Sequence, residues 1–182
     1  MNFKLQYGED FDENYLKRIM EIDEIVYAED GYVGELKNMV ARYLVDPRQF
    51  VCIEDTESGR LAGYINFIPC TKALYEDIRY QSEHIRDDDI RPQELEPLKQ
   101  TGNDLFIISI ALHPDFKDTD ALRLMVSTFN VNDQMLRDSA EGMGRKVVTF
   151  ANMLRDKAFP LAEAVNFMLT DCLLYTSDAA DE

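Results

Sequence analysis

The segment HPDFKDTDALRL, residues 113–124, combines residue types that could bind an anionic group. It follows LFIISIAL (105–112), the most apolar run of the chain, and precedes a stretch with helical periodicity. A loop between a buried strand and a helix presents the first backbone N–H groups of that helix, which attract phosphate together with the helix dipole. Lys117 adds a positive charge, but Asp118 and Asp120 stand where glycines are usual. The segment therefore has the outline of a phosphate loop and two residues that oppose an anion.

These two aspartates allow two interpretations. Beside a phosphate and partly desolvated, each would oppose binding by on the order of 1 kcal/mol or more through like charge. Aspartate is also a common helix N-cap, which would make Asp118 or Asp120 purely structural. Under either interpretation, the backbone amides of the loop could still bind an anion.

Three other groups of residues contain the residue types of metal or catalytic sites, but their spacing in the sequence does not match such a site. Asp87–Asp89 and His84 could ligate a metal, but consecutive aspartates alternate in direction along an extended chain, so we expect a solvated charge run and no metal. Cys70 has no histidine or acid at a recognisable spacing, so we expect a passive thiol. His113 precedes a proline in a loop, and a catalytic base is not indicated there.

The elements that must position these residues alternate along the chain. Alternating or apolar runs predict strands at 3–7, 50–55, 60–69, 105–112 and 146–154. Apolar residues at helical spacing predict helices at about 14–27, 36–44, 73–82, 122–139 and 160–167, the first capped by Asp12 or Asn14. Residues 83–99 are highly charged, and we expect them to form an irregular segment between two strands, called the excursion below. This order predicts a mixed α/β (α+β) fold with helices on both faces of the sheet.

The predicted strand 60–69 contains a glycine, which in a strand indicates a bulge or a close backbone approach. Strict alternation places its side chains on two faces: Leu61, Gly63, Ile65 and Phe67 on one, and Ala62, Tyr64, Asn66 and Ile68 on the other.

Composition narrows the class of protein. The 182 residues suit one domain, and 19 basic against 35 acidic residues give a net charge of −16. Nucleic acid and membrane surfaces are therefore not expected as partners, because both require a basic footprint. The longest apolar run falls far short of the roughly 20 residues that span a bilayer, and the N-terminus lacks the apolar core of a signal peptide. Three scattered cysteines form no disulfide framework, which favours a reduced cytoplasmic setting.

The last eleven residues, CLLYTSDAADE (172–182), differ in composition from the segment before them. They resemble the translated end of a transposase-type sequencing adaptor, a contaminant of metagenomic reading frames. We therefore predict a domain at 1–171 and a non-native tail at 172–182, with the natural chain cut near Asp171 and its last strand or strands missing.

The order of elements and the segment ISIALHPDFKDTDALRLMVSTF (108–129) resemble the GNAT superfamily of acyl-CoA-dependent N-acyltransferases. The likeness includes the lead-in HPDFK (113–117), the strand RLAGYINFIP (60–69) and AEAVNF (162–167), whose Asn-Phe stands where the family commonly has Gly-Phe. The resemblance implies a mixed, mostly antiparallel sheet with a V-shaped opening between the fourth and fifth strands.

The resemblance also implies a site for acetyl-CoA. Backbone groups of the fourth strand would pair with the pantetheine arm almost as an added strand would, and loop amides would face the pyrophosphate. The residues implied are Ile110, Ala111, Leu112, Lys117, Asp118, Thr119, Asp120, Ala121 and Leu122. Asp120 and Leu122 depart from the small residues that the family has at those positions.

The resemblance assigns no catalytic side chain. The tyrosine that often protonates the thiolate in the family is replaced here by Ala162. Ser109, Asn66 or Tyr64 could orient the attacking amine through water, although each is also ordinary in a strand. Glu29 and Asp30, in the loop that often lines the family's acceptor site, would suit an amine or are simply solvated.

The function implied is transfer of an acetyl group from acetyl-CoA to an amine on a small molecule or peptide. The alternative is a non-catalytic protein of the same fold that binds acyl-CoA or a protein partner in regulation. We expect a cytoplasmic bacterial protein that is a monomer or a homodimer.

Overall fold

The computed structural model describes residues 2–30, 33–80, 87–100 and 102–151. Its sheet has five strands in chain order: β1 (Phe3–Tyr7), β2 (Phe50–Asp55), β3 (Leu61–Cys70), β4 (Asp104–Leu112) and β5 (Thr149–Ala151). Neighbours from β1 to β4 are antiparallel, whereas β5 runs parallel to β4. The predicted mixed, mostly antiparallel sheet is confirmed.

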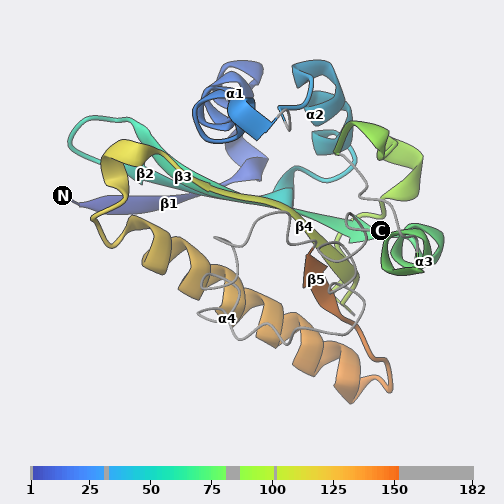
Figure 1. Cartoon of the computed structure of the whole chain (residues 1–182). Helices are drawn as coiled ribbons and strands as arrows, with labels where there is room; N and C mark the ends of the chain where they lie inside the picture. The colour runs from blue at the N-terminus through green and yellow to red at the C-terminus, as the bar shows by residue number, and fades with distance from the viewer. Residues whose placement is uncertain (1, 31–32, 81–86, 101, 152–182) are drawn as a thin grey trace, which may run out of the picture.

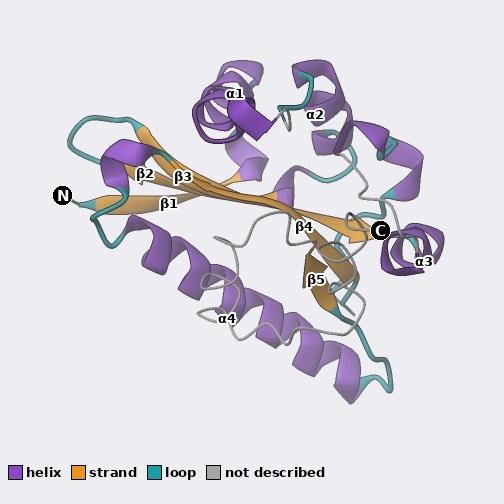
Figure 2. Cartoon of the chain, viewed as in Figure 1, coloured by secondary structure: helices purple, strands orange, loops and turns teal. Residues whose placement is uncertain are grey.

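Helices cover both faces of this sheet, as predicted (Figure 1). α1 (Glu13–Tyr27) and α2 (Leu36–Tyr43) lie on one face, and the long α4 (Ala121–Gly142) lies on the other. α3 (Lys72–Tyr80) packs at one end of the sheet against β3 and β4 (Figure 2). Because the sheet is apolar on both sides, each face has a core: Ile53, Ile65 and Met125 belong to the α4 side, and Ile19, Phe50 and Tyr64 to the α1 side. A further cluster, which includes Ile68, Leu74 and Phe106, lies under α3.

Local signals set the ends of the helices. Asp12 caps α1, since its Oδ1 accepts the N–H of Tyr15 at 2.8 Å. α4 ends before Gly144, whose φ of 72° lets the Arg145 N–H reach the Ala140 carbonyl at 2.9 Å. The helix ends at Gly142, three residues later than predicted. Of the two glycines in GMGRK (142–146), Gly144 is the one that stops it.

A bulge in β3 corrects the predicted faces of that strand. Ile53 pairs with Gly63 but Glu54 pairs with Leu61, so Ala62 is an extra residue. Strict alternation is therefore broken: Leu61 packs with Tyr64 on the α1 side, and Ala62 packs with Ile65 on the α4 side. The assignment of Leu61 and Ala62 to the opposite faces was wrong because alternation holds only in an unbroken strand.

Gly63 also permits a close approach of two strands. A Cβ at this position would lie 2.6 Å from the Ala111 carbonyl oxygen of β4. We expect Gly63→Ala to destabilise the protein by about 1–3 kcal/mol, because one of the two backbones must shift. Gly142→Ala is the matched control, since a Cβ there meets open space and should not destabilise. Urea unfolding measures both, and equal stabilities would contradict the close approach.

Several predictions concern other parts of the chain. The strand predicted at 146–154 is β5, which begins only at Thr149. The helix at 160–167, Ala162 and the tail 172–182 lie outside the described residues, as does His84. In the described part of the chain, no helix is long and apolar enough to cross a membrane.

Candidate functional site

β4 pairs fully with one neighbouring strand and only in part with the other. Among the described residues, which end at Ala151, β4 pairs with β3 along its whole length but with β5 only through Leu105, Phe106 and Ile107. From Ile108 to Leu112 this edge of β4 has no strand partner among the described residues, and three successive side chains, at 108–110, are only half-buried. A bulge lies at Ile108 in the pairing of β4 with β3, because Phe67 pairs with Ile107 and Asn66 with Ser109.

The unpaired edge presents backbone groups of two residues. The His113 N–H donates to the Ala62 carbonyl of β3 at 2.9 Å. Because backbone direction alternates along an antiparallel strand, Ala111 also directs its groups toward β3, whereas Ile110 and Leu112 direct theirs away. The Ile110 carbonyl accepts the hydroxyl of Tyr27 at 2.7 Å. The structure thus brings Ile110 and Leu112 to the open edge.

The loop after β4 leads into the first turn of α4. Its backbone amides at Asp118, Asp120 and Leu122 donate to no group in the described part of the chain. Asp120 occupies the N-cap position without capping: its carboxylate instead accepts from Arg123 Nη2 at 2.9 Å, and both side chains are exposed. Thr119 Oγ1 accepts the Ala121 N–H at 3.3 Å in its place. Asp120 therefore stands at the predicted N-cap position, but the predicted hydrogen bond from the helix N-terminus to its side chain is not formed.

A buried chain of hydroxyl groups ends at the same edge. Ser109 Oγ donates to Tyr27 Oη at 3.3 Å and lies 2.9 Å from Tyr64 Oη. Tyr64 is fully buried and hydrogen-bonds to Asp23 of α1. Tyr64 and Ser109 were predicted as candidates, whereas Asn66 lies apart and donates to the Gln49 carbonyl. Asp23 and Tyr27 were missed.

Burial sets the charge state of this cluster. It raises the pKa of Asp23 to about 7, and the Asp87 carboxylate adds to this, while Tyr64 and Arg42 act in the opposite direction. Burial likewise holds the pKa of Tyr64 well above its usual range. One carboxyl in the cluster therefore changes charge near neutral pH, while Tyr64 stays protonated.

The remaining candidates have structural roles. Asp87 is not simply solvated, because it accepts from the buried Arg42 through Oδ2 at 2.9 Å and through its carbonyl at 2.6 Å. Asp88 accepts from Asn38 at 2.8 Å, so the charge run docks onto α2. Cys70 is buried, which raises the pKa of its thiol to about 12 and leaves it passive. Among the described residues, no three metal-ligating side chains gather.

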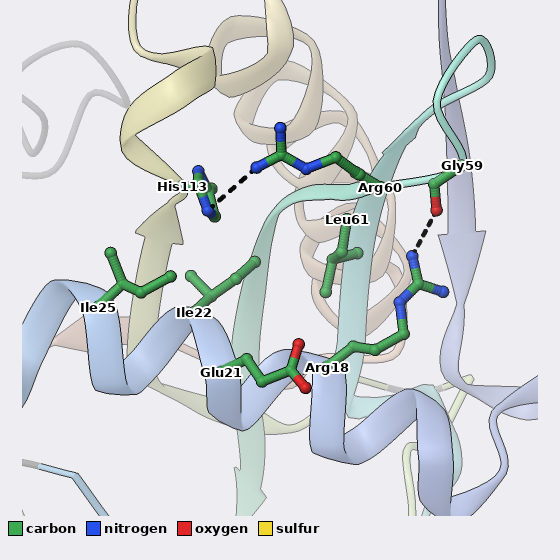
Figure 3. A pocket seen from close by; sticks show the side chains of 8 residues that line it. All are labelled: Arg18, Glu21, Ile22, Ile25, Gly59, Arg60, Leu61 and His113. Carbon is green, nitrogen blue, oxygen red and sulfur yellow. Dashed lines mark hydrogen bonds between the residues drawn. The ribbon is translucent and has the colours of Figure 1, made fainter.

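A cavity of about 260 Å³ lies just beyond the C-terminal end of β4, between α1 and the β2–β3 turn (Figure 3). Arg18 and Arg60 border it, but both are already engaged: Arg18 donates to the Gly59 carbonyl at 2.7 Å, and Arg60 pairs with Asp115 at 2.7 Å. His113 lines it and accepts the Asp115 N–H through Nδ1. None of the nine predicted cofactor residues lines this cavity.

Solved structures share this architecture. Ard1 from Thermoplasma volcanium aligns with a TM-score of 0.56 at 11% identity, over 93% of this chain and 85% of that chain. The chain has a GNAT-like fold. The GNATL loading domain of CurA from Lyngbya majuscula aligns at 0.54 and 9% identity over 72% of this chain, which spans 58% of that chain. A mosquito arylalkylamine N-acetyltransferase like 5b aligns at 0.53 and 14% identity, over 91% and 82%.

Comparisons of sequence give no further assignment. No family model matches this sequence, and a search of curated proteins finds no match. At identities this low the solved structures establish the GNAT-like fold and leave activity to be argued from the site.

Proposed function

We propose that the protein transfers an acetyl group from acetyl-CoA to an amine. The observation that supports this most is the continuity of two features: the edge of β4 that has no strand partner among the described residues leads, through the loop 113–120, into the first turn of α4. An extended arm bearing amides could pair with the edge while its anionic end reaches the helix N-terminus. The name of one solved neighbour, a mosquito arylalkylamine N-acetyltransferase like 5b, agrees with this chemistry.

Backbone groups of β4 would bind the extended arm of acetyl-CoA, and the loop before α4 would bind its pyrophosphate. Ile110 and Leu112 would pair with the arm, whereas Ala111 remains bonded to β3 and contributes by shaping the strand. The amides of Asp118, Asp120 and Leu122 would face the pyrophosphate, with Lys117 as the added cation. The acyl carbonyl develops negative charge during transfer, and a backbone N–H of β4 is a fixed donor for it. Thr119 and Ala121 would hold the turn in place.

Calorimetric titration of the full chain with acetyl-CoA and CoA tests the proposal. Binding of both is expected, followed by thioester loss with at least one amine from a panel of 2-phenylethylamine, an aminoglycoside and a peptide with a free N-terminus. No binding of either at millimolar concentration would exclude the proposal. Binding without turnover would favour the alternative, a non-catalytic protein of the same fold in regulation.

Asp120→Asn should tighten CoA binding about two- to fivefold at low salt. The substitution removes a like charge at the helix N-terminus and frees Arg123, and such charges contribute about 0.3–1 kcal/mol. The gain should shrink as salt rises, because both side chains are exposed. Asp138→Asn, near the other end of α4, is the control and should change nothing. An unchanged affinity for Asp120→Asn would place the phosphates elsewhere.

We also propose a cytoplasmic location, with a small molecule or peptide as acceptor. Size-exclusion chromatography would distinguish the monomer from the homodimer.

A further inference from the structure

We propose that Tyr27, Ser109, Tyr64 and Asp23 form a relay that takes the proton from the attacking amine and stores it on Asp23. The proposal rests on the proposed function, since it assigns the base for that amine. Its starting point is the open edge of β4, where the Tyr27 hydroxyl bonds to the Ile110 carbonyl at 2.7 Å.

The relay runs from a half-buried end to a buried one. Tyr27 and Ser109 are half-buried at the opening, whereas Tyr64 is 1% exposed and Asp23 is 9% exposed. Each member contacts the next: Tyr27 with Ser109 at 3.3 Å, Ser109 with Tyr64 at 2.9 Å, and Tyr64 with Asp23. Three elements contribute, namely α1, β3 and β4. A proton entering at Tyr27 therefore has an unbroken path to a carboxylate shielded from solvent.

Counting hydrogens over these contacts gives the path two directions. The three links and the bond to the Ile110 carbonyl are four contacts, and three hydroxyls supply three hydrogens. If Asp23 is protonated, it supplies the fourth, and every hydrogen points outward from Asp23 to the carbonyl. If Asp23 is ionised, the direction reverses: Tyr64 donates to Asp23, Ser109 to Tyr64, and Tyr27 to Ser109. The Ile110 carbonyl is then released.

Conversion from the state with ionised Asp23 to the state with protonated Asp23 takes up one proton, and this is the proton that the acceptor amine must lose. The ammonium group of the acceptor gives one proton to the Tyr27 oxygen, and Tyr27 passes its own proton to Ser109. Ser109 passes its proton to Tyr64, and Tyr64 passes its proton to Asp23. The neutral amine is then free to attack the thioester carbon, and the relay is left in its outward direction. No other reactant is needed.

The surroundings of Asp23 place it near the working range of a base. Tyr64 of β3 hydrogen-bonds to Asp23, and Tyr27 lies on the same helix as Asp23. Arg42 of α2 stabilises the charged form of Asp23, whereas Asp87, from the segment between α3 and β4, destabilises it. Burial raises the pKa of Asp23 most, and together with these groups it gives a value of about 7, so that at neutral pH a large fraction of Asp23 can accept a proton. The carboxylate acts through its neighbours and never touches the amine.

The pH dependence of kcat/KM tests the relay, with acetyl-CoA and whichever amine of the panel turns over. In the wild type the rate should fall tenfold per pH unit below about pH 7. Asp23→Asn should lose this limb and be about 10²-fold slower at pH 8, with acetyl-CoA affinity within threefold of wild type. Ser109→Ala should behave similarly, whereas Ser127→Ala, on the exposed side of α4, should not. An Asp23→Asn enzyme with a normal rate and a normal acid limb would overturn the proposal.

An infrared titration tests the same relay without an acceptor. Raising the pH from 5 to 8 should remove one protonated-carboxyl band, absent in Asp23→Asn, and shift the C–O bands of two tyrosines together. The Tyr27 component, identified with Tyr27→Phe, should vanish in Ser109→Ala while the Tyr64 component remains. A wild-type spectrum without a Tyr27 component would show that Asp23 and Tyr27 are not linked. Failure to bind acetyl-CoA would overturn the proposed function only, since this titration does not depend on it.

Discussion

Asp23→Asn is expected to stabilise the protein in neutral and alkaline solution and to have little effect in acid. The carboxyl has a pKa of about 7 in the folded chain and 3.8 as its ordinary value, so the folded state binds its proton more tightly than the unfolded state. The stability that the protonated form provides is complete below about pH 4 and is lost as the pH rises to about 7. At about 1.4 kcal/mol for each pH unit, the loss approaches roughly 4 kcal/mol.

Asparagine resembles the protonated carboxyl in size and can still hydrogen-bond to Tyr64 through its side-chain amide, so the variant should escape this loss. Urea unfolding of both proteins at pH 5, 6, 7 and 8 should show a difference in unfolding free energy that widens with pH. The difference isolates Asp23, because every other titrating group is common to both proteins. Asp77→Asn, on the exposed surface of α3, should stay within about 0.5 kcal/mol throughout. A difference that is flat with pH would mean that Asp23 is ionised in the fold.

Arg42→Ala should destabilise the protein by about 3–5 kcal/mol. The Arg42 side chain is only 3% exposed, and its guanidinium donates to both the carboxylate and the carbonyl of Asp87. Removing one partner of a buried pair leaves the other charge desolvated and unpaired. The variant also removes the cation that lowers the pKa of Asp23, so its loss of stability should grow at alkaline pH.

The exposed pair of Lys72 and Glu76 gives a matched control, and Lys72→Ala should cost less than about 1 kcal/mol. Arg42→Met combined with Asp87→Leu should recover part of the loss, because apolar side chains of similar size need no compensating charge. Thermal and urea unfolding measure all three proteins. If Arg42→Ala lowers the free energy of unfolding no more than the surface control does, the excursion packs against α2 without the help of this pair.

The order of strands and helices could be predicted because each element depends on its own residues. Asp12 caps α1 and Gly144 stops α4 through contacts within a few positions, and such contacts are visible as sequence patterns. The place of the loop 113–124 after a buried strand was predictable for the same reason. Tyr64 and Ser109 could be named as candidates, together with Asn66, because the resemblance made their strands the third and fourth of the sheet, where a polar group could orient the amine.

Departures from a regular pattern could be predicted only in part: the glycine in strand 60–69 indicated a bulge or a close approach, but not which residue would be the extra one. The bulges at Ala62 and Ile108 change which side chains share a face, and each depends on pairing with a strand distant in sequence. Asp23 gave one signal, since it interrupts the apolar stripe of its helix, but its partner Tyr64 lies 41 residues away. Asp87 reads as a solvated charge until the structure brings Arg42 against it.

The sequence by itself therefore determined the elements, their caps and the loop that leads into α4, because these follow from hydrogen bonds and periodicity between near neighbours. Only the tertiary structure decided that α1, β3 and β4 enclose a carboxyl with three hydroxyls. The physical reason is that burial and charge are set by segments that meet in space. The charge state of Asp23 depends on four such segments at once.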